Sequence, residues 1–277
     1  MPQTPLAATL QDAFRFPLEG EAWKARFLTG SGLIFAGMFI PILPLVFVFG
    51  YVVAVMRRIV RGEAPAMPAW DDWGRLGSDG LGATLAGLVC LLPGLLVFLG
   101  GMALYFGASL AMPFVASGSG DSPGVILGFT AFLLAAMAIL FISIAVATLL
   151  FAAGAIPLPV AVAHQAARGR VGAALRVGEW WRILRANKMG FFIAWVVVIG
   201  LLTILYSGVV VLGYSVVLAC LAPFLAAPAS FYLLLVAGAV FAQSYREGAE
   251  ALLQGTVAQP ATGETSEGLA EGSVEGS

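Results

Sequence analysis

Residues 124–163 read GVILGFTAFLLAAMAILFISIAVATLLFAAGAIPLPVAVA, and they contain no Asp, Glu, Lys, Arg or His. About 20 apolar residues, each rising about 1.5 Å along an α-helix, are enough to span a bilayer. This run is about twice that length. It therefore predicts helical structure embedded in a membrane.

The rest of the chain follows the same pattern. Hydrophobic residues make up 60% of the 277 residues and charged residues only 10%, and the mean hydropathy is +0.97. A soluble domain carries about a quarter charged residues. Further apolar runs occupy 27–56, 80–116, 189–215 and 216–245. We predict an all-α, polytopic transmembrane helical bundle in one membrane-embedded domain, residues 1–254.

The C-terminal tail differs in composition. Residues 255–277 carry four glutamates and no aromatic residue. Such a segment buries too little apolar area to offset its conformational entropy. We predict a disordered acidic tail.

Prolines divide the apolar runs: Pro41 and Pro44 in the first, Pro93 in the second, Pro157 and Pro159 at the end of the third. Each proline removes a backbone donor and clashes with the preceding helical turn. We expect broken helices, shielded by their neighbours in a compact bundle. Segment 27–56 either crosses the membrane once or returns as a hairpin at its prolines. The hairpin keeps the N-terminus cytoplasmic, which we favour.

Two local patterns predict helix contacts. Leu6, Leu10 and Phe14 share one face of a helix over residues 6–16, and Pro17 ends it, as expected for an amphipathic helix at the membrane surface. Small residues recur four positions apart, which allows close helix packing. These pairs are Gly82 and Ala86, Ala103 and Gly107, and Gly238 and Ala242.

Basic residues predict the orientation. They concentrate between the first and second runs and between the third and fourth, whereas 117–123 and 213–223 have none. Basic loops usually face the cytoplasm. We therefore predict crossings at 94–116, 124–152, 189–212 and 224–245, with a cytoplasmic C-terminus in a multi-pass protein of the cell membrane.

The apolar runs also exclude some chemistry. They carry no Asp, Glu, Lys, Arg or His, although proton relays, ion sites and voltage sensors depend on such groups. Cys90 and Cys220 lie in apolar runs, and His164 is the single histidine, so no zinc-type cluster is expected. We predict no metal site, no cofactor, no nucleic-acid partner and no enzymatic activity.

Charge and tryptophan instead gather at the cytoplasmic boundary. The candidate residues are Arg57, Arg58, Arg61, Trp70, Asp71, Asp72, Trp73, Arg182 and Arg185. They are typical of a helix anchored at anionic headgroups. The arginines also suit recognition of a lipid phosphate, and Asp71, Asp72 and Asp79 suit a divalent cation.

A family resemblance rests on the same stretch. Its motifs are Gly50-Tyr51, Arg57-Arg58, Arg61-Gly62-Glu63, Pro68, Trp70-Asp71-Asp72-Trp73-Gly74 and Asp79-Gly80-Leu81, followed by IPLPVAVAHQAARG (156–169), 179–188, Pro223, Pro228, Phe231 and Tyr232. Over about residues 5–250 the chain resembles an uncharacterised prokaryotic membrane-protein family, domain of unknown function 4013. Gly77 departs from the aromatic residue that relatives more often carry. The resemblance implies a membrane fold and a cell-membrane location, but no activity.

Together these observations predict a non-enzymatic membrane protein that binds anionic phospholipid at its cytoplasmic edge and organises or assists partners, whose identity the sequence leaves open. The alternative is an uncoupled carrier or channel for a small or lipidic solute, with a path at the breaks of Pro41–Pro44 and Pro93. A third hypothesis is an enzyme acting on lipid headgroups through Asp71, Asp72 and Asp79.

Overall fold

The computed structural model describes residues 6–119 and 122–257. That part of the chain is helical with no β-strand, which confirms the predicted all-α class. The tail was predicted to begin at residue 255. Its residues after Val257 lie outside the part of the chain that the structure describes. The elements are α1 (Leu6–Arg15), η1 (Phe16–Leu18), α2 (Trp23–Ala36), α3 (Leu43–Val60), α4 (Trp73–Ser119), α5 (Pro123–Ala155), α6 (Leu158–Arg168), η2 (Val171–Leu175), α7 (Val177–Ala186), α8 (Lys188–Gly213) and α9 (Val216–Val257), where η marks a 3-10 helix.

Five helical stretches in the described chain are long and apolar enough to cross a bilayer by length and composition. They are Leu43–Val60, Trp73–Ala111, Pro123–Arg168, Lys188–Gly213 and Val217–Gln254. Their outer faces are apolar as well, and Leu127, Leu149 and Ile204 are each more than 70% exposed. Monomeric soluble proteins rarely expose large contiguous apolar surfaces. These helices therefore have the composition and surface of a membrane protein.

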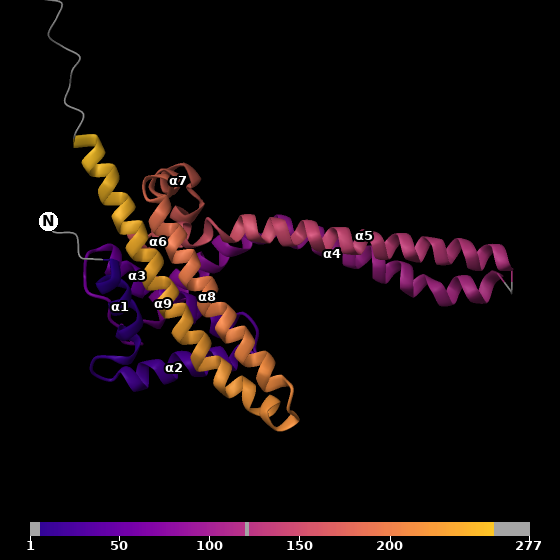
Figure 1. The fold of residues 1–277 in the computed structure, drawn as a ribbon, viewed down its shortest axis with the longest axis horizontal. Helices are drawn as coiled ribbons and strands as arrows, with labels where there is room; N and C mark the ends of the chain where they lie inside the picture. Colours follow the sequence, from indigo (N-terminus) through magenta and orange to yellow (C-terminus); the bar gives the residue numbers. More distant parts are fainter. Residues whose placement is uncertain (1–5, 120–121, 258–277) are drawn as a thin grey trace, which may run out of the picture.

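The molecule is V-shaped, with two helical hairpins that diverge from a common base (Figure 1). One hairpin is α4 with α5, and the other is α8 with the first part of α9. The bundle is packed at the base rather than along its whole length, since α5 buries only Ala136 and Ala147. Small residues of α4 allow α5 to pack closely against it. Gly94 of α4 faces Phe151 of α5, and Gly101 of α4 faces Ser143 of α5.

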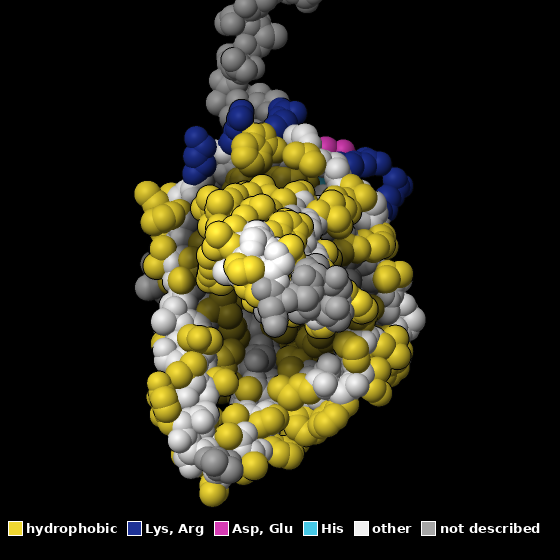
Figure 2. Space-filling model, turned by 90° about the vertical axis from the view of Figure 1, so that its right-hand side faces the viewer, with side chains coloured by type: hydrophobic (Ala, Val, Ile, Leu, Met, Phe, Trp, Pro, Cys, Tyr) yellow, Lys and Arg dark blue, Asp and Glu magenta, His cyan; other side chains and the backbone are white. Residues whose placement is uncertain are grey.

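Basic side chains gather along the upper edge of the face drawn in Figure 2, and the surface below them is mainly apolar. The two hairpins correspond to the predicted crossing pairs 94–116 with 124–152 and 189–212 with 224–245. The base carries the basic loops, while the hairpin tips point away from it. Which side of a membrane the base faces stays a prediction.

The prolines act in two different ways. The chain breaks at Pro41 and at Pro157, between α2 and α3 and between α5 and α6. Pro44 and Pro159 lie in the first turns of the helices that follow, where proline is tolerated because the missing N–H has no helical partner anyway. Other prolines lie inside continuous helices, namely Pro93, Pro113, Pro223 and Pro228.

Segment 27–56 forms two helices that run in opposite directions. On α2, Phe27 contacts Phe231 of α9 and Phe35 stacks on Phe224, so α2 runs antiparallel to α9. On α3, Tyr51 contacts Phe231 and Met56 lies near Gly238 further along α9, so α3 runs parallel to α9. The segment therefore folds back on itself, but of its two helices α3 alone is among the stretches long and apolar enough to cross a bilayer. Whether the segment crosses the membrane once or returns as a hairpin stays a prediction.

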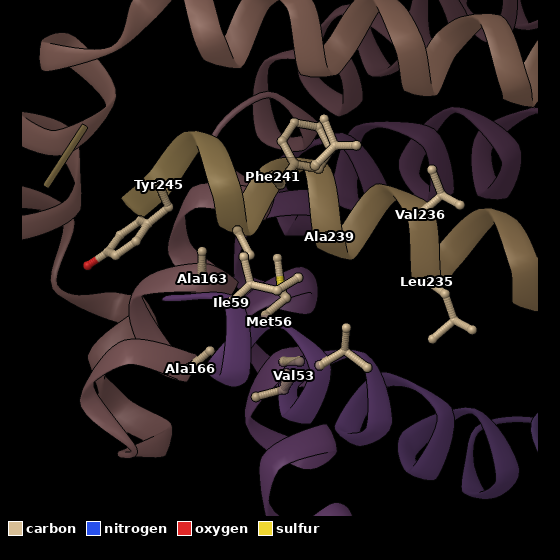
Figure 3. Close-up of a cluster of buried hydrophobic side chains, with 14 of the residues drawn as sticks. Val53, Met56, Ile59, Ala163, Ala166, Leu235, Val236, Ala239, Phe241 and Tyr245 are labelled. Carbon is tan, nitrogen blue, oxygen red and sulfur yellow. The ribbon is translucent and has the colours of Figure 1, made fainter. Parts of the chain in front are cut away.

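The core lies in the base, where α3, α6 and α9 meet (Figure 3). It includes Val53, Met56 and Ile59 of α3 together with Ala163 of α6 and Leu235 of α9, all at most 4% exposed. Full burial of one large aliphatic side chain stabilises the fold by about 1.5–3 kcal/mol. These contacts fix the base from which both hairpins extend.

A close crossing of α3 and α4 positions the candidate residues. A Cβ atom at Gly50 would overlap the Leu76 carbonyl group, and one at Gly80 would overlap the Val46 carbonyl group. Only glycine lets the two backbones approach so closely. The crossing brings the C-terminal end of α3 beside the first turns of α4.

Candidate functional site

Arg57 of α3 and Asp79 of α4 form a buried ion pair near the crossing of these two helices. Arg57 Nη2 donates to both oxygens of Asp79, at 2.8 and 2.9 Å, and the two side chains are only 7% and 10% exposed. Arg57 Nε also donates to the Ala166 carbonyl oxygen of α6 at 3.3 Å. Arg57 therefore joins α3, α4 and α6, and its guanidinium is not available to a lipid headgroup.

The other charges of the first basic region lie at the surface. Arg58 pairs with Glu63 at 3.3 Å, and Arg61 and Asp71 are exposed. Asp72 accepts a hydrogen bond from the Arg75 backbone N–H at 2.9 Å in the first turn of α4. These residues remain candidates for contact with headgroups, as the sequence predicted.

The three carboxylates of the enzyme hypothesis do not converge. Asp79 faces Arg57, whereas Asp72 caps the start of α4. Within the described ranges no group of three His, Cys, Asp or Glu side chains is arranged to hold a metal ion. The shared metal site that this hypothesis requires is thus not formed by the residues proposed for it.

The two tryptophans of the opening motif have different environments. Trp70 stacks on Tyr51 with ring centroids 4.1 Å apart, and its Nε1 donates to the Arg26 carbonyl oxygen at 3.0 Å. Tyr51 in turn donates to the Pro68 carbonyl oxygen at 2.7 Å. Trp70 therefore fixes the loop between α3 and α4 to α2 and α3, while Trp73 is 43% exposed.

The prolines proposed for a carrier path do not lie at one level. Val46 of α3 contacts Gly80 of α4, so the break at Pro41–Pro44 lies near the second or third turn of α4. Pro93 follows Gly80 by 13 residues, which places it about 20 Å further along the helix. Pro93 is also exposed. The break at Pro41–Pro44 therefore lies at a different level from Pro93, which is inside the continuous helix α4. Whether the protein carries a solute stays a prediction.

The second basic region forms an open groove between α6 and α7. Arg168, Arg170 and Arg176 line it together with Gly172 and Ala173 of η2. The sequence showed these arginines as part of a basic loop, but the sites it singled out were elsewhere. Their convergence depends on the fold, because α6 ends at Arg168 with the left-handed Gly169 and η2 turns the chain back.

A single carboxylate neutralises part of this groove. Glu179 of α7 accepts from Arg168 at 3.0 Å and from Arg176 at 3.2 Å. The hydrogen bond from Arg176 is the largest factor that lowers the pKa of Glu179. Arg170 is exposed. The groove thus combines three guanidinium groups with one carboxylate and has a net positive charge.

Exposed apolar residues lie next to the groove residues in the chain. Val171 is 42% exposed, Leu175 53% and Val177 56%. On the following turn of α7, Arg185 lies over the exposed Trp181 ring at 5.3 Å, and Arg182 is exposed too. α7 buries Trp180 and Ile183 on its opposite face. Arginines beside exposed apolar groups suit the boundary between headgroups and acyl chains.

Buried polar groups of α6 hold the groove to the base. His164 is 1% exposed, and its two ring nitrogens contact the Tyr245 hydroxyl at 2.7 Å and Glu179 Oε2 at 3.1 Å. Gln165 Nε2 donates to the Asp79 carbonyl oxygen at 2.8 Å. The sequence showed His164 only as the single histidine, because nothing in its local sequence indicates that α9 covers it.

Fold and surface together define an all-α membrane protein built from helical hairpins on a polar base. The sequence profile of a family described as "Protein of unknown function (DUF4013)" matches residues 33–214. The chain belongs to this family, as the motifs around Trp70 and Trp73 predicted. No curated protein and no solved structure matches the chain.

Proposed function

We propose that this protein is a non-enzymatic, multi-pass component of the cell membrane that binds anionic phospholipid at a cytoplasmic base and organises or assists protein partners there. The observation that carries the proposal is the groove of Arg168, Arg170 and Arg176, with the exposed apolar residues Val171 and Leu175 next to them in the chain. Guanidinium groups bind phosphate oxygens through charge-assisted hydrogen bonds. The exposed apolar residues extend the contact toward the acyl chains.

The proposal makes the groove, rather than Arg57, the headgroup site. Arg57 is occupied by Asp79, and separating that pair would leave two buried charges. Four other arginines add non-specific electrostatic attraction to an anionic leaflet, because they lie at the surface. They are Arg58, Arg61, Arg182 and Arg185. Each basic residue near such a surface contributes about 1 kcal/mol. The groove supplies the convergent geometry that these separate charges lack.

Native mass spectrometry of the full-length protein, released from micelles that contain phosphatidylglycerol or phosphatidylcholine, tests the proposal. The wild type should retain phosphatidylglycerol preferentially. Arg170→Glu changes the charge by two units, so at about 1 kcal/mol per charge it should weaken retention roughly 30-fold. Arg15→Glu is the matched control, because Arg15 is an exposed arginine of α1, outside the groove.

A combined Arg168→Gln, Arg170→Gln and Arg176→Gln variant provides a second measurement. Its folding is checked by thermal unfolding, because Glu179 then loses two partners. If the folded triple variant retained phosphatidylglycerol as the wild type does, the groove would not be the lipid site and the proposal would fail.

A further inference from the structure

A second cavity lies between α1, α3, α8 and α9. It has a volume of about 290 Å³ and is lined partly by apolar side chains, including Leu10, Ile59 and Val240. This volume is far larger than a single water molecule needs, and the cavity is partly open to its surroundings. That volume accommodates a phospholipid headgroup but not two acyl chains.

The polar lining carries both signs of charge. Arg246 contributes a guanidinium, and Asp12, Glu63 and Glu247 contribute carboxylates. Glu63 is paired with Arg58. The Glu247 carboxylate instead accepts hydrogen bonds from two neutral side-chain amides, those of Gln243 at 3.1 Å and Asn187 at 3.1 Å. The cavity lining therefore offers one guanidinium group together with carboxylate groups.

Arg246 also has an unused donor. Its Nε atom is buried and makes no hydrogen bond to any part of the chain that the structure describes. The Oε1 atom of Glu250 lies 3.6 Å from this Nε, within ion-pair distance. A buried donor without a partner destabilises the fold, and more so when it is charged. An anionic oxygen in the cavity would satisfy it.

The cavity opens beside a membrane helix. Gly190, Ile193 and Ala194 of α8 form part of its wall, and the neighbouring Met189 and Phe192 are 68% and 64% exposed. A ligand whose headgroup lies in the cavity can therefore extend apolar chains along the outer face of α8. This arrangement suits a lipid better than a small soluble molecule.

We infer that this cavity binds one zwitterionic phospholipid with a primary ammonium headgroup, the chemistry of phosphatidylethanolamine. Its phosphate faces Arg246, its ammonium donates to Glu247 and Asp12, and its acyl chains follow α8. A trimethylated ammonium has no N–H to donate and is bulkier, so phosphatidylcholine fits poorly. An anionic headgroup without the amine leaves the carboxylates unpaired and repelled. The inference uses none of the groove arginines and stands apart from the proposed function.

The test is native mass spectrometry of the full-length protein with equimolar phosphatidylethanolamine, phosphatidylcholine and phosphatidylglycerol. In an Arg170→Glu background, which weakens the groove, one phosphatidylethanolamine should still be retained at least tenfold over phosphatidylcholine. Arg246→Gln and Asp12→Asn should each reduce that retention at least fivefold. Equal retention of phosphatidylethanolamine and phosphatidylcholine, or preferential retention of phosphatidylglycerol in this background, would overturn the inference.

A steric variant covers the case in which the charge variants perturb the fold. Ala64 is exposed and lines the cavity, so Ala64→Trp should fill the cavity and abolish retention while the melting temperature is unchanged. Ala69→Trp, at an exposed alanine of the same loop, is the control. Soluble glycerophosphoethanolamine, added as competitor, should not displace the lipid. Displacement at equal concentration, or unaltered retention in a folded Ala64→Trp, would contradict a lipid site here.

Discussion

Replacing Asp79 by leucine should destabilise the protein severely, because it leaves the Arg57 guanidinium buried without its counter-charge. The pair is 7% and 10% exposed, so water and salt screen it little. After the change, the Ala166 carbonyl oxygen at 3.3 Å is the remaining hydrogen-bond acceptor among the contacts described for Arg57. Removing one partner of a buried pair costs about 3–5 kcal/mol. We expect Asp79→Leu to lower the free energy of unfolding by that amount.

The assay is equilibrium unfolding in mixed micelles, followed by circular dichroism as the denaturing detergent fraction rises. The double variant Arg57→Met with Asp79→Leu removes both charges and should recover most of the loss, because apolar replacement of a buried pair is often neutral. Asp72→Ala is the control for a surface carboxylate and should cost about 1 kcal/mol as a lost helix cap. A cost below 1 kcal/mol for Asp79→Leu, or a double variant as unstable as the single one, would refute this account of the base.

Three further outcomes follow from the same geometry. Gly50→Ala should prevent normal folding, since its Cβ overlaps a backbone carbonyl group, whereas Gly100→Ala, with nothing within 4 Å of its Cβ, should leave the thermal unfolding curve unchanged. Trp70→Phe keeps the stacking but loses the hydrogen bond to the Arg26 carbonyl oxygen, so it should cost about 1 kcal/mol in the same unfolding assay. Because the pKa of Glu179 is lowered, its carboxylate contact is present above the ordinary Glu value and is lost as the pH falls through the lowered one. Phosphatidylglycerol retention should therefore rise as the pH falls below about 4.3, and Glu179→Gln should raise it about fivefold at pH 7.

The class and the helical runs could be predicted from the sequence because they depend only on composition and length. The same reasoning could not place the two hairpins relative to each other. In a membrane, the face of a helix that meets lipid is as apolar as the face that meets another helix. Exposed Phe141 and buried Ala147 thus belong to one uniformly apolar α5, and no periodicity distinguishes them.

Small residues illustrate the same limit. Gly82 lies against Gln165 and Gly238 against Val52, so two of the three predicted pairs include an interface glycine. Gly107 of the third pair has nothing within 4 Å. The spacing of small residues shows where a close approach is possible. A partner helix must also reach that level, which depends on contacts far apart in the chain.

The candidate site shows why pairing was harder to predict than location. Arg57 and Asp79 were both placed at the boundary, but whether they bind each other, a lipid or a metal depends on the crossing of Gly50 over Gly80. The groove was harder still. Arg168 and Arg176 stand among other basic residues in a loop, and only the reversal of the chain at η2 brings them together.

The polar contacts of the base explain how such sparsely packed hairpins keep a defined arrangement. Arg57 connects α3 with α4 and α6, His164 connects α6 with α7 and α9, and the Asn187 side chain donates from the start of α8 to the Ser244 carbonyl oxygen of α9 at 3.0 Å. Apolar contacts alone fix orientation weakly in lipid, because sliding a helix exchanges one apolar neighbour for another. Hydrogen bonds and ion pairs are directional, so one set of helix positions satisfies them all. Lipid bound at the groove would contact α6 and α7. The contacts of Glu179 with His164, and of His164 with Tyr245, would then connect the lipid to α9, which forms part of the second hairpin.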